Sequence, residues 1–152
     1  MSSPYPTLNL PPMEMELRDD KIFDPFRRKW LVCTPEEWVR QNFLAYLRHY
    51  LGYPRSLIKV EQGLESAGNF FRADAIVYSR EIVPLALIEC KAPHVTIDDK
   101  TFRQIAVYTA EIRARVVMAT NGKSHFICRF SEDFHDYTFL KSIPPYDGLL
   151  TL

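Results

Sequence analysis

Short runs of apolar residues in the middle of the chain follow patterns that are typical of β-strands. Residues 57–62 alternate apolar and polar side chains, which predicts a half-buried strand. Residues 75–78 and 85–88 are short β-branched and apolar runs, and a polar stretch that ends at Pro84 separates them. This pattern predicts two consecutive strands that pair as a hairpin.

Two longer segments have the spacing of amphipathic helices. Thr34 is predicted to cap the first helix, Pro35 takes its first position, and Glu37 completes a capping box. Apolar residues at helical spacing then define its buried face, which ends before Gly52: Val39, Phe43, Tyr46, Leu47 and Tyr50. A second helix is predicted over residues 97–114, and its apolar face includes Phe102, Ile105, Ala106 and Ile112.

The two ends of the chain carry weaker signals. Residues 1–29 hold five of the eleven prolines, which predicts an arm with at most a short strand at residues 13–17, packed on the sheet or on a second chain. Residues 116–120 and 125–130 are predicted to pair through Asn121-Gly122. The remaining residues 131–152 fit an edge strand, a dimer contact or a truncated end.

Together these elements predict an α/β fold with a mixed central sheet of about five strands, flanked by two helices. The length of 152 residues fits one domain. We divide it into an N-terminal arm (1–29), a central domain (30–130) and a C-terminal extension (131–152) that packs on the same domain.

Composition limits the classes of protein that fit. The chain has 19 basic and 19 acidic residues, so its net charge is zero, which argues weakly against a strong autonomous grip on nucleic acid. No apolar run approaches the roughly 18 residues of a membrane helix, and the N-terminus lacks the features of a signal peptide, so we expect a cytoplasmic protein without a membrane partner. The three cysteines fit reduced core thiols.

Three chemically useful residues flank the two predicted hairpin strands: Asp74 directly before the first run, and Glu89 and Lys91 after the second. Side chains alternate along a strand, so Glu89 and Lys91 share one face and Cys90 lies on the other with Ile88. Two carboxylates can bind a hard divalent cation, and an ammonium beside the attacking water can stabilise a pentavalent phosphate. This set suits metal-assisted phosphodiester hydrolysis, and a surface salt bridge is the alternative.

The spacing of Asp74 and Glu89-Cys90-Lys91 resembles the PD-(D/E)xK nuclease superfamily. The chain is more closely similar to the N-terminal nuclease domain of the motor (R) subunit of type I restriction enzymes, in its short stand-alone form. Residues 34–37 and 39–41, 72–74, 89–93, 104–108 and 120–122 carry the resemblance. Ala73 departs from it, because it stands where the superfamily name has proline.

The resemblance implies a magnesium-dependent deoxyribonuclease, with manganese as a second candidate ion. It implies that Asp74, Glu89 and the Cys90 carbonyl oxygen hold the metal, while Lys91 assists the attacking water. Glu36 precedes Val39 by three positions and so faces inward, where the superfamily often has a further acid; a helix-dipole role is the alternative.

Gln104 and Tyr108 lie four residues apart on the second predicted helix, so they share one side of it. In the superfamily this motif positions substrate or water, whereas an ordinary polar helix face is the alternative. Arg72 lies two residues before Asp74 and is predicted to neutralise the acid pair, to contact a phosphate, or to form an ordinary ion pair.

The resemblance also implies partners: DNA, and the motor or specificity subunits of a restriction system, while a homodimer stays open. One rival function is a catalytically silent nuclease fold that binds nucleic acid or protein in a defence system. Another is an enzyme that acts on RNA or a different phosphate ester. The chain has no phosphate-binding loop of the G-x-x-x-x-G-K-[ST] type, so an ATP-driven role is excluded.

Overall fold

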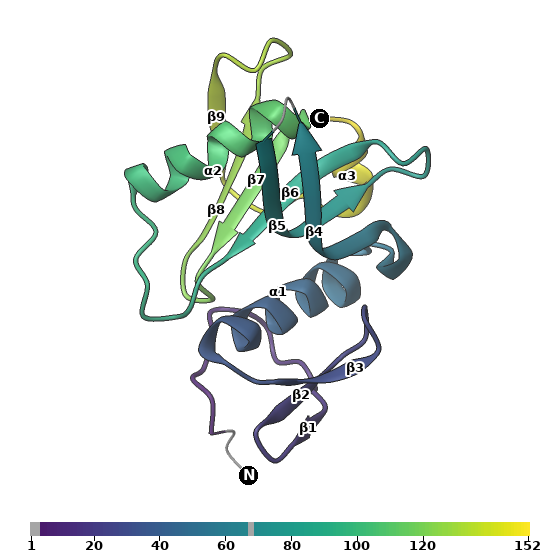
Figure 1. The fold of residues 1–152 in the computed structure, drawn as a ribbon, viewed down its shortest axis with the longest axis vertical. Helices are drawn as coiled ribbons and strands as arrows, with labels where there is room; N and C mark the ends of the chain where they lie inside the picture. The colour runs from purple at the N-terminus through teal and green to yellow at the C-terminus, as the bar shows by residue number, and fades with distance from the viewer. Residues whose placement is uncertain (1–3, 67–68) are drawn as a thin grey trace.

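A six-stranded sheet and a separate three-stranded sheet lie on opposite sides of one long helix, α1 (Pro35–Leu51), in a computed structural model of the chain (Figure 1). The structure describes residues 4–66 and 69–152; for 62–71 and 108–110 it describes the backbone alone, without 67–68. Among these residues, no helix has the length and apolar character needed to cross a membrane.

The six-stranded sheet has the strand order β4-β5-β6-β7-β8-β9. The pairing of β6 with β7 is parallel and the other neighbouring pairs are antiparallel, which confirms a mixed sheet. Its strands are β4 (Ile58–Ser66), β5 (Asn69–Tyr78), β6 (Pro84–Cys90), β7 (Val116–Thr120), β8 (His125–Phe130) and β9 (Tyr137–Leu140). The predicted count of about five is one short, because β9, which comes from the C-terminal extension, pairs with β8 as an edge strand.

Local sequence signals explain the bounds of α1. Thr34 is the cap, and its hydroxyl accepts a hydrogen bond from the Glu37 amide at 3.1 Å. Gly52 ends the helix with φ of 75°, a left-handed conformation that glycine adopts readily. The reciprocal half of the predicted capping box is wrong, because the Glu37 carboxylate accepts a hydrogen bond from Gln41.

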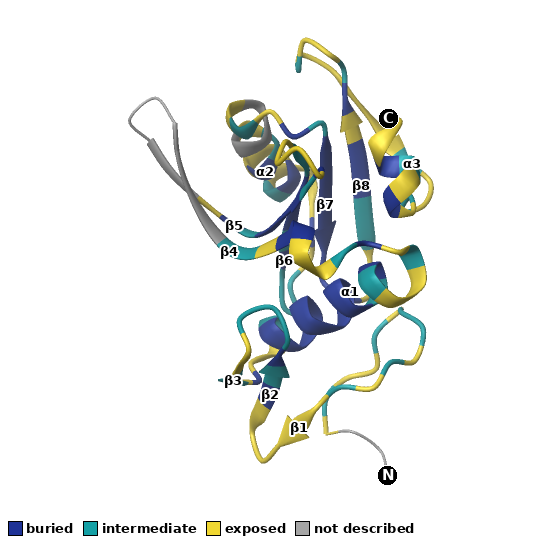
Figure 2. Cartoon of the chain, turned by 90° about the vertical axis from the view of Figure 1, so that its right-hand side faces the viewer, coloured by how far each residue is buried: buried dark blue, intermediate teal, exposed yellow. Residues whose placement is uncertain are grey.

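The N-terminal arm forms more structure than its sequence predicts. It contains β1 (Leu17–Arg18) and β2 (Lys21–Asp24), and β2 pairs with both β1 and β3 (Lys29–Val32) in an antiparallel sheet next to α1 (Figures 1 and 2). The arm covers the side of α1 that faces away from the main sheet, where Trp38 packs with Ile22 of β2. Three polar residues of the helix are buried as well: Arg40, Gln41 and Asn42. Tyr50 was predicted on the buried face, but it is 52% exposed.

Helices cover both faces of the main sheet. Ala86, Ile88 and Cys90 belong to one core cluster with α1 residues such as Phe43, which confirms that these three strand residues share a face. Leu87 belongs to a second cluster with Phe102 of α2 (Asp99–Ile112). Strand β6 is therefore buried on both faces until Glu89. Two short helices, η1 (Arg55–Leu57) and α3 (Tyr146–Leu150), complete the fold.

Candidate active site

Asp74 and Glu89 lie beside each other on neighbouring strands. The antiparallel register pairs Ala75 of β5 with Ile88 of β6, so the next residue on each strand brings the two carboxylates together. The Asp74 carboxylate also accepts a hydrogen bond from the Cys90 backbone amide at 2.7 Å. Two acids and one amide thus meet where β6 ends.

The electrostatics of Glu89 reflect this crowding. Burial raises the pKa of Glu89, and the charge of Asp74 and a side-chain hydrogen bond with Asp74 raise it further, to about 9. The positive charge of Lys91 acts in the opposite direction. Without another cation, the two carboxyl groups therefore share a proton at neutral pH.

Glu36 and Lys91 lie within electrostatic reach of the acid pair. Burial and the charge of Asp74 raise the pKa of Glu36, while Arg40 and Lys91 lower it. Lys91 follows β6 directly, and its backbone amide donates a hydrogen bond to the Thr120 carbonyl at 2.8 Å, which continues the pairing with β7. The fold thus gathers four residues that the sequence singled out: Asp74, Glu89, Lys91 and Glu36.

The donor set at this point suits a hard divalent cation. Magnesium binds oxygen ligands, and it commonly takes only one or two carboxylates with water and substrate oxygens completing its shell. A cation here would also replace the proton that Asp74 and Glu89 share. Within residues 4–66 and 69–152, no three His, Cys, Asp or Glu side chains form a preformed metal cluster, so the remaining ligands would be backbone, water or substrate oxygens.

Arg40 is the arginine that approaches the acid pair. Its side chain is 7% exposed, and its guanidinium lies 3.9 Å from Asp74, 3.4 Å from Glu37 and 2.9 Å from Glu61. Burial lowers the pKa of Arg40, but the charge of Glu37 and the hydrogen bond to Glu61 reverse this effect, and the pKa is raised. The sequence did not single out Arg40 as a site residue, because a polar residue on a helix predicts exposure.

Glu61 is the centre of an ion-pair network beside the acid pair. It pairs with Arg27 at 2.7 Å, with Arg40 at 2.9 Å and with Arg72 at 2.9 Å. Arg27 also contacts Asp24 at 2.7 Å, so the network ties the arm to α1 and the main sheet. The Arg72 side chain is 64% exposed and pairs with Glu61 in the structure, which is the ion-pair alternative of its prediction.

The predicted pair on the second helix is resolved in part. Gln104 lies on α2 and is exposed to solvent, whereas the neighbouring Ile105 is buried. The side chain of Tyr108 lies outside the described residues. The roles of Gln104 and Tyr108 stay predictions.

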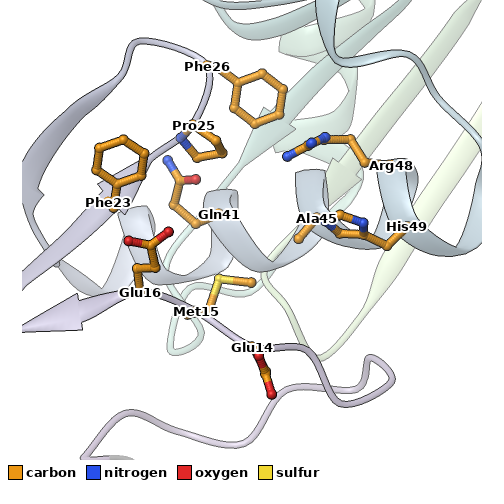
Figure 3. Close-up of a pocket in the computed structure, with 10 residues that line it drawn as sticks. All are labelled: Glu14, Met15, Glu16, Phe23, Pro25, Phe26, Gln41, Ala45, Arg48 and His49. Atoms are coloured by element: carbon orange, nitrogen blue, oxygen red, sulfur yellow. The ribbon is translucent and has the colours of Figure 1, made fainter.

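A separate cavity lies between the arm and α1, away from the acid pair. Figure 3 shows that Gln41, Ala45, Arg48 and His49 line it from the helix, while Phe26 and other arm residues line it from the opposite side. Its volume is about 160 Å³, and Asp74, Glu89 and Lys91 are not among its lining residues. This cavity therefore belongs to the packing of the arm and not to the candidate active site.

A comparison with known protein families assigns the chain to one of them. The family model described as the type I restriction enzyme R protein N terminus matches residues 35–144, more than half of the chain. The chain belongs to this family. The match contains Glu36, Asp74, Glu89 and Lys91, and it extends beyond residue 130 into the C-terminal extension.

A solved structure resembles this R-protein N-terminal domain. It is a fragment assigned as the HsdR subunit of a type I restriction enzyme from Vibrio vulnificus, with a TM-score of 0.56 and 19% sequence identity. The match covers 78% of this chain and 25% of that one, so the chain spans about a quarter of the length of that fragment. It confirms the restriction-endonuclease-like α/β fold. A search of curated proteins found no match.

Proposed function

We propose that the chain is a metal-dependent nuclease domain that hydrolyses DNA phosphodiester bonds in a restriction system. One observation carries the proposal: Asp74 and Glu89 meet on adjacent strands where β6 ends, and the pKa of Glu89 is raised to about 9 by burial and by Asp74. Adjacent, partly buried carboxylates with a strongly shifted pKa are typical of functional sites. Membership in the R-protein N-terminal family supports the restriction context.

In this proposal Asp74 and Glu89 hold magnesium or manganese, together with the Cys90 carbonyl oxygen. The cation, when bound, would supply Lewis-acid stabilisation of the phosphate oxygens and a more acidic water. The Cys90 amide orients the Asp74 carboxylate by its 2.7 Å hydrogen bond. Arg40, 3.9 Å from Asp74, keeps positive charge beside the same carboxylate.

Lys91 follows Glu89 by two positions and places an ammonium beside the acid pair. Water adds to phosphorus, one bridging phosphorus–oxygen bond breaks, and the leaving oxygen takes up a proton. Lys91 stabilises the negative charge that builds on the phosphate in this step. Glu36 is the candidate for accepting the proton that the attacking water loses, because burial and Asp74 raise its pKa.

The other assignments extend the site towards substrate. Gln104 and Tyr108 on α2 would position water or the DNA strand. Arg72, which is mostly exposed, would contact a phosphate while it pairs with Glu61. Motor and specificity subunits of a restriction system are the proposed protein partners, and a second copy of the chain is a further candidate.

The test is cleavage of supercoiled and linear DNA by the purified chain with magnesium or manganese. We expect cleavage by the wild type, and its loss in Lys91→Ala and Asp74→Asn. The matched control is Lys123→Ala, which removes an exposed lysine outside the site and should cleave as the wild type does. Equal cleavage by wild type and Lys91→Ala would remove the lysine from the mechanism.

A calorimetric magnesium titration separates the two ways in which cleavage could be absent. The wild type could bind magnesium without cleaving DNA. If Asp74→Asn abolishes this binding, the result would indicate an active centre that needs a partner subunit. Absence of both binding and cleavage would contradict the proposal and favour the silent nuclease fold that binds nucleic acid or protein.

A further inference from the structure

A groove beside the ion-pair network collects basic residues from distant parts of the sequence. Its volume is about 290 Å³, and four cationic side chains line it: Arg27, Arg28, Arg55 and Lys59. Arg27 and Arg28 come from the turn between β2 and β3, Arg55 from η1, and Lys59 from β4. None of the described residues that line the groove is acidic.

Three of these four cations are available to a ligand. Arg27 is neutralised by Asp24 and Glu61, each at 2.7 Å. Arg28, Arg55 and Lys59 are exposed, and no described carboxylate forms an ion pair with them. Arg55 donates a hydrogen bond to the neutral Pro25 carbonyl at 3.2 Å, which directs its side chain towards the arm.

Two further observations concern the charge and the backbone conformation of this region. Arg48, on the adjacent part of α1, has a lowered pKa because it is partly buried and because the charge of Arg55 lies near it. Arg28 has φ of 55°, a left-handed conformation that non-glycine residues rarely adopt. The turn therefore holds a basic residue at the groove in a costly conformation, in a chain whose net charge is zero.

The groove is connected to the candidate active site by contacts between side chains. Arg27 pairs with Glu61, Glu61 pairs with Arg40, and Arg40 lies 3.9 Å from Asp74. Strand β4 therefore carries both Lys59 of the groove and Glu61 of this series of contacts. A strand held in the groove would have a fixed position relative to Asp74 and Glu89.

We propose that this groove, formed by Arg28, Arg55 and Lys59, binds the phosphate backbone of DNA outside the catalytic centre. Separated, exposed cations on several elements suit successive phosphates of a polymer, whereas a single small anion requires convergent donors. The proposal rests on the proposed function, because it supplies the substrate contact of that site. It also explains how a chain of zero net charge engages a polyanion.

The experiment measures binding of a fluorescently labelled DNA duplex in EDTA over a range of salt concentrations, so that cleavage plays no part. The variant Arg28→Gln/Arg55→Gln/Lys59→Gln is compared with Lys123→Gln/Arg129→Gln/Lys141→Gln, which removes the same charge from exposed positions outside the groove. We expect the groove variant to lose tenfold or more in affinity. Its slope of log K against log salt should fall by about 2–3, since each lost phosphate contact contributes about 0.9.

The control variant should keep nearly the wild-type affinity and slope. Equal losses of affinity in the two variants, or absence of duplex binding by the wild type, would overturn the groove proposal. Displacement of the duplex by micromolar inorganic phosphate would also overturn it, because that result indicates a site for a small anion. Thermal unfolding of each variant checks the fold, and Arg28→Gln/Lys59→Gln, which keeps the Arg55 hydrogen bond, should still reduce the slope by about 1–2.

The experiments distinguish an error in the groove proposal from an error in the nuclease proposal. Lys91→Ala should lose cleavage but keep the larger part of the salt slope of duplex binding, which the three groove cations contribute. The groove variant should still bind magnesium at the acid pair and should need more DNA to reach the same rate of cleavage. Normal cleavage at limiting DNA by the groove variant would overturn the groove and leave the nuclease proposal standing.

Discussion

Two neighbouring groups of carboxylates in this molecule have opposite surroundings. Asp24, Glu37 and Glu61 lie where the arm meets α1 and β4, and each of them contacts an arginine. Asp74, in the middle of β5, and Glu89, near the end of β6, lie beside each other. Arg40 lies between the two groups, since it contacts both Glu61 and Asp74.

The pKa shifts follow this difference in surroundings. Burial would raise the pKa of Glu61, but the hydrogen bond from Arg40 and the charge of Arg27 lower it below the usual value. The pKa of Glu89 is raised to about 9, because burial and Asp74 both disfavour its charge. Glu61 is therefore held as an anion by the arginines around it, whereas Glu89 has to bind a proton or an added cation.

This contrast separates structural from functional carboxylates by a physical criterion. A buried acid with a dedicated arginine stabilises the fold only while the pair is complete. Two acids placed together repel each other when both are charged, so their position indicates a ligand. The predictions below test whether this separation holds.

The largest effect is expected for Arg40→Ala. This change leaves Glu37 and Glu61 with one fewer partner in a buried site, and it should lower the free energy of unfolding by about 3–5 kcal/mol. Asp74→Asn keeps an acceptor for the Cys90 amide and removes repulsion with Glu89, so it should change the metal-free value by less than about 1 kcal/mol. Urea unfolding in EDTA measures both. A loss in Asp74→Asn as large as that in Arg40→Ala would show that the acid pair is structural.

A smaller loss is expected for Glu61→Gln. The glutamine keeps the shape of the side chain but removes the charge that faces Arg27, Arg40 and Arg72. Hydrogen bonds to charged groups contribute about 1.5–3 kcal/mol each, so a loss of that order is expected in urea unfolding. The control is Glu132→Gln at an exposed position, which should leave stability unchanged. Wild-type stability in Glu61→Gln would mean that the network contributes nothing to the fold.

The acid pair should also give metal-free stability a distinctive pH dependence. The pKa of Glu89 is about 9 in the folded state, against an ordinary value of 4.5, so between these pH values the folded state binds more protons than the unfolded state. The free energy of unfolding should therefore fall as pH rises through this range, by at most about 1.4 kcal/mol per pH unit. Glu89→Gln should have a flatter profile in the same titration of thermal unfolding in EDTA. Magnesium should stabilise the wild type most at the alkaline end, and identical profiles would contradict a shared proton.

Much of the candidate site could be predicted from the sequence because its determinants are local. Two strands joined by a short connection form a hairpin, and the hairpin places Asp74 beside Glu89. Strand alternation then separates Cys90 from Glu89 and Lys91. The helix start at Thr34 is equally local, and the structure has it where the capping signal predicts.

The features that the sequence did not predict depend on contacts between distant segments of the chain. Arg40 is buried beside Glu61 of β4 and Asp74 of β5, which are distant from it in the sequence, and the arm was not predicted to form a sheet. The basic groove joins the arm, η1 and β4, so no window of sequence contains it. Glu61 adopts φ of 51° within β4, and such a local irregularity changes the facing of side chains in a way that strict alternation cannot predict.

Arg72 gives the smallest effect and the sharpest test of the boundary between the two groups. The sequence placed it with Asp74, whereas its guanidinium pairs with Glu61 and its side chain is 64% exposed. Exposed ion pairs contribute about 0–1 kcal/mol, so Arg72→Ala should barely change unfolding in urea. If Arg72 contacts a DNA phosphate, the salt slope of duplex binding should fall by about 0.9. An unchanged slope together with unchanged stability would show that Arg72 belongs to neither group.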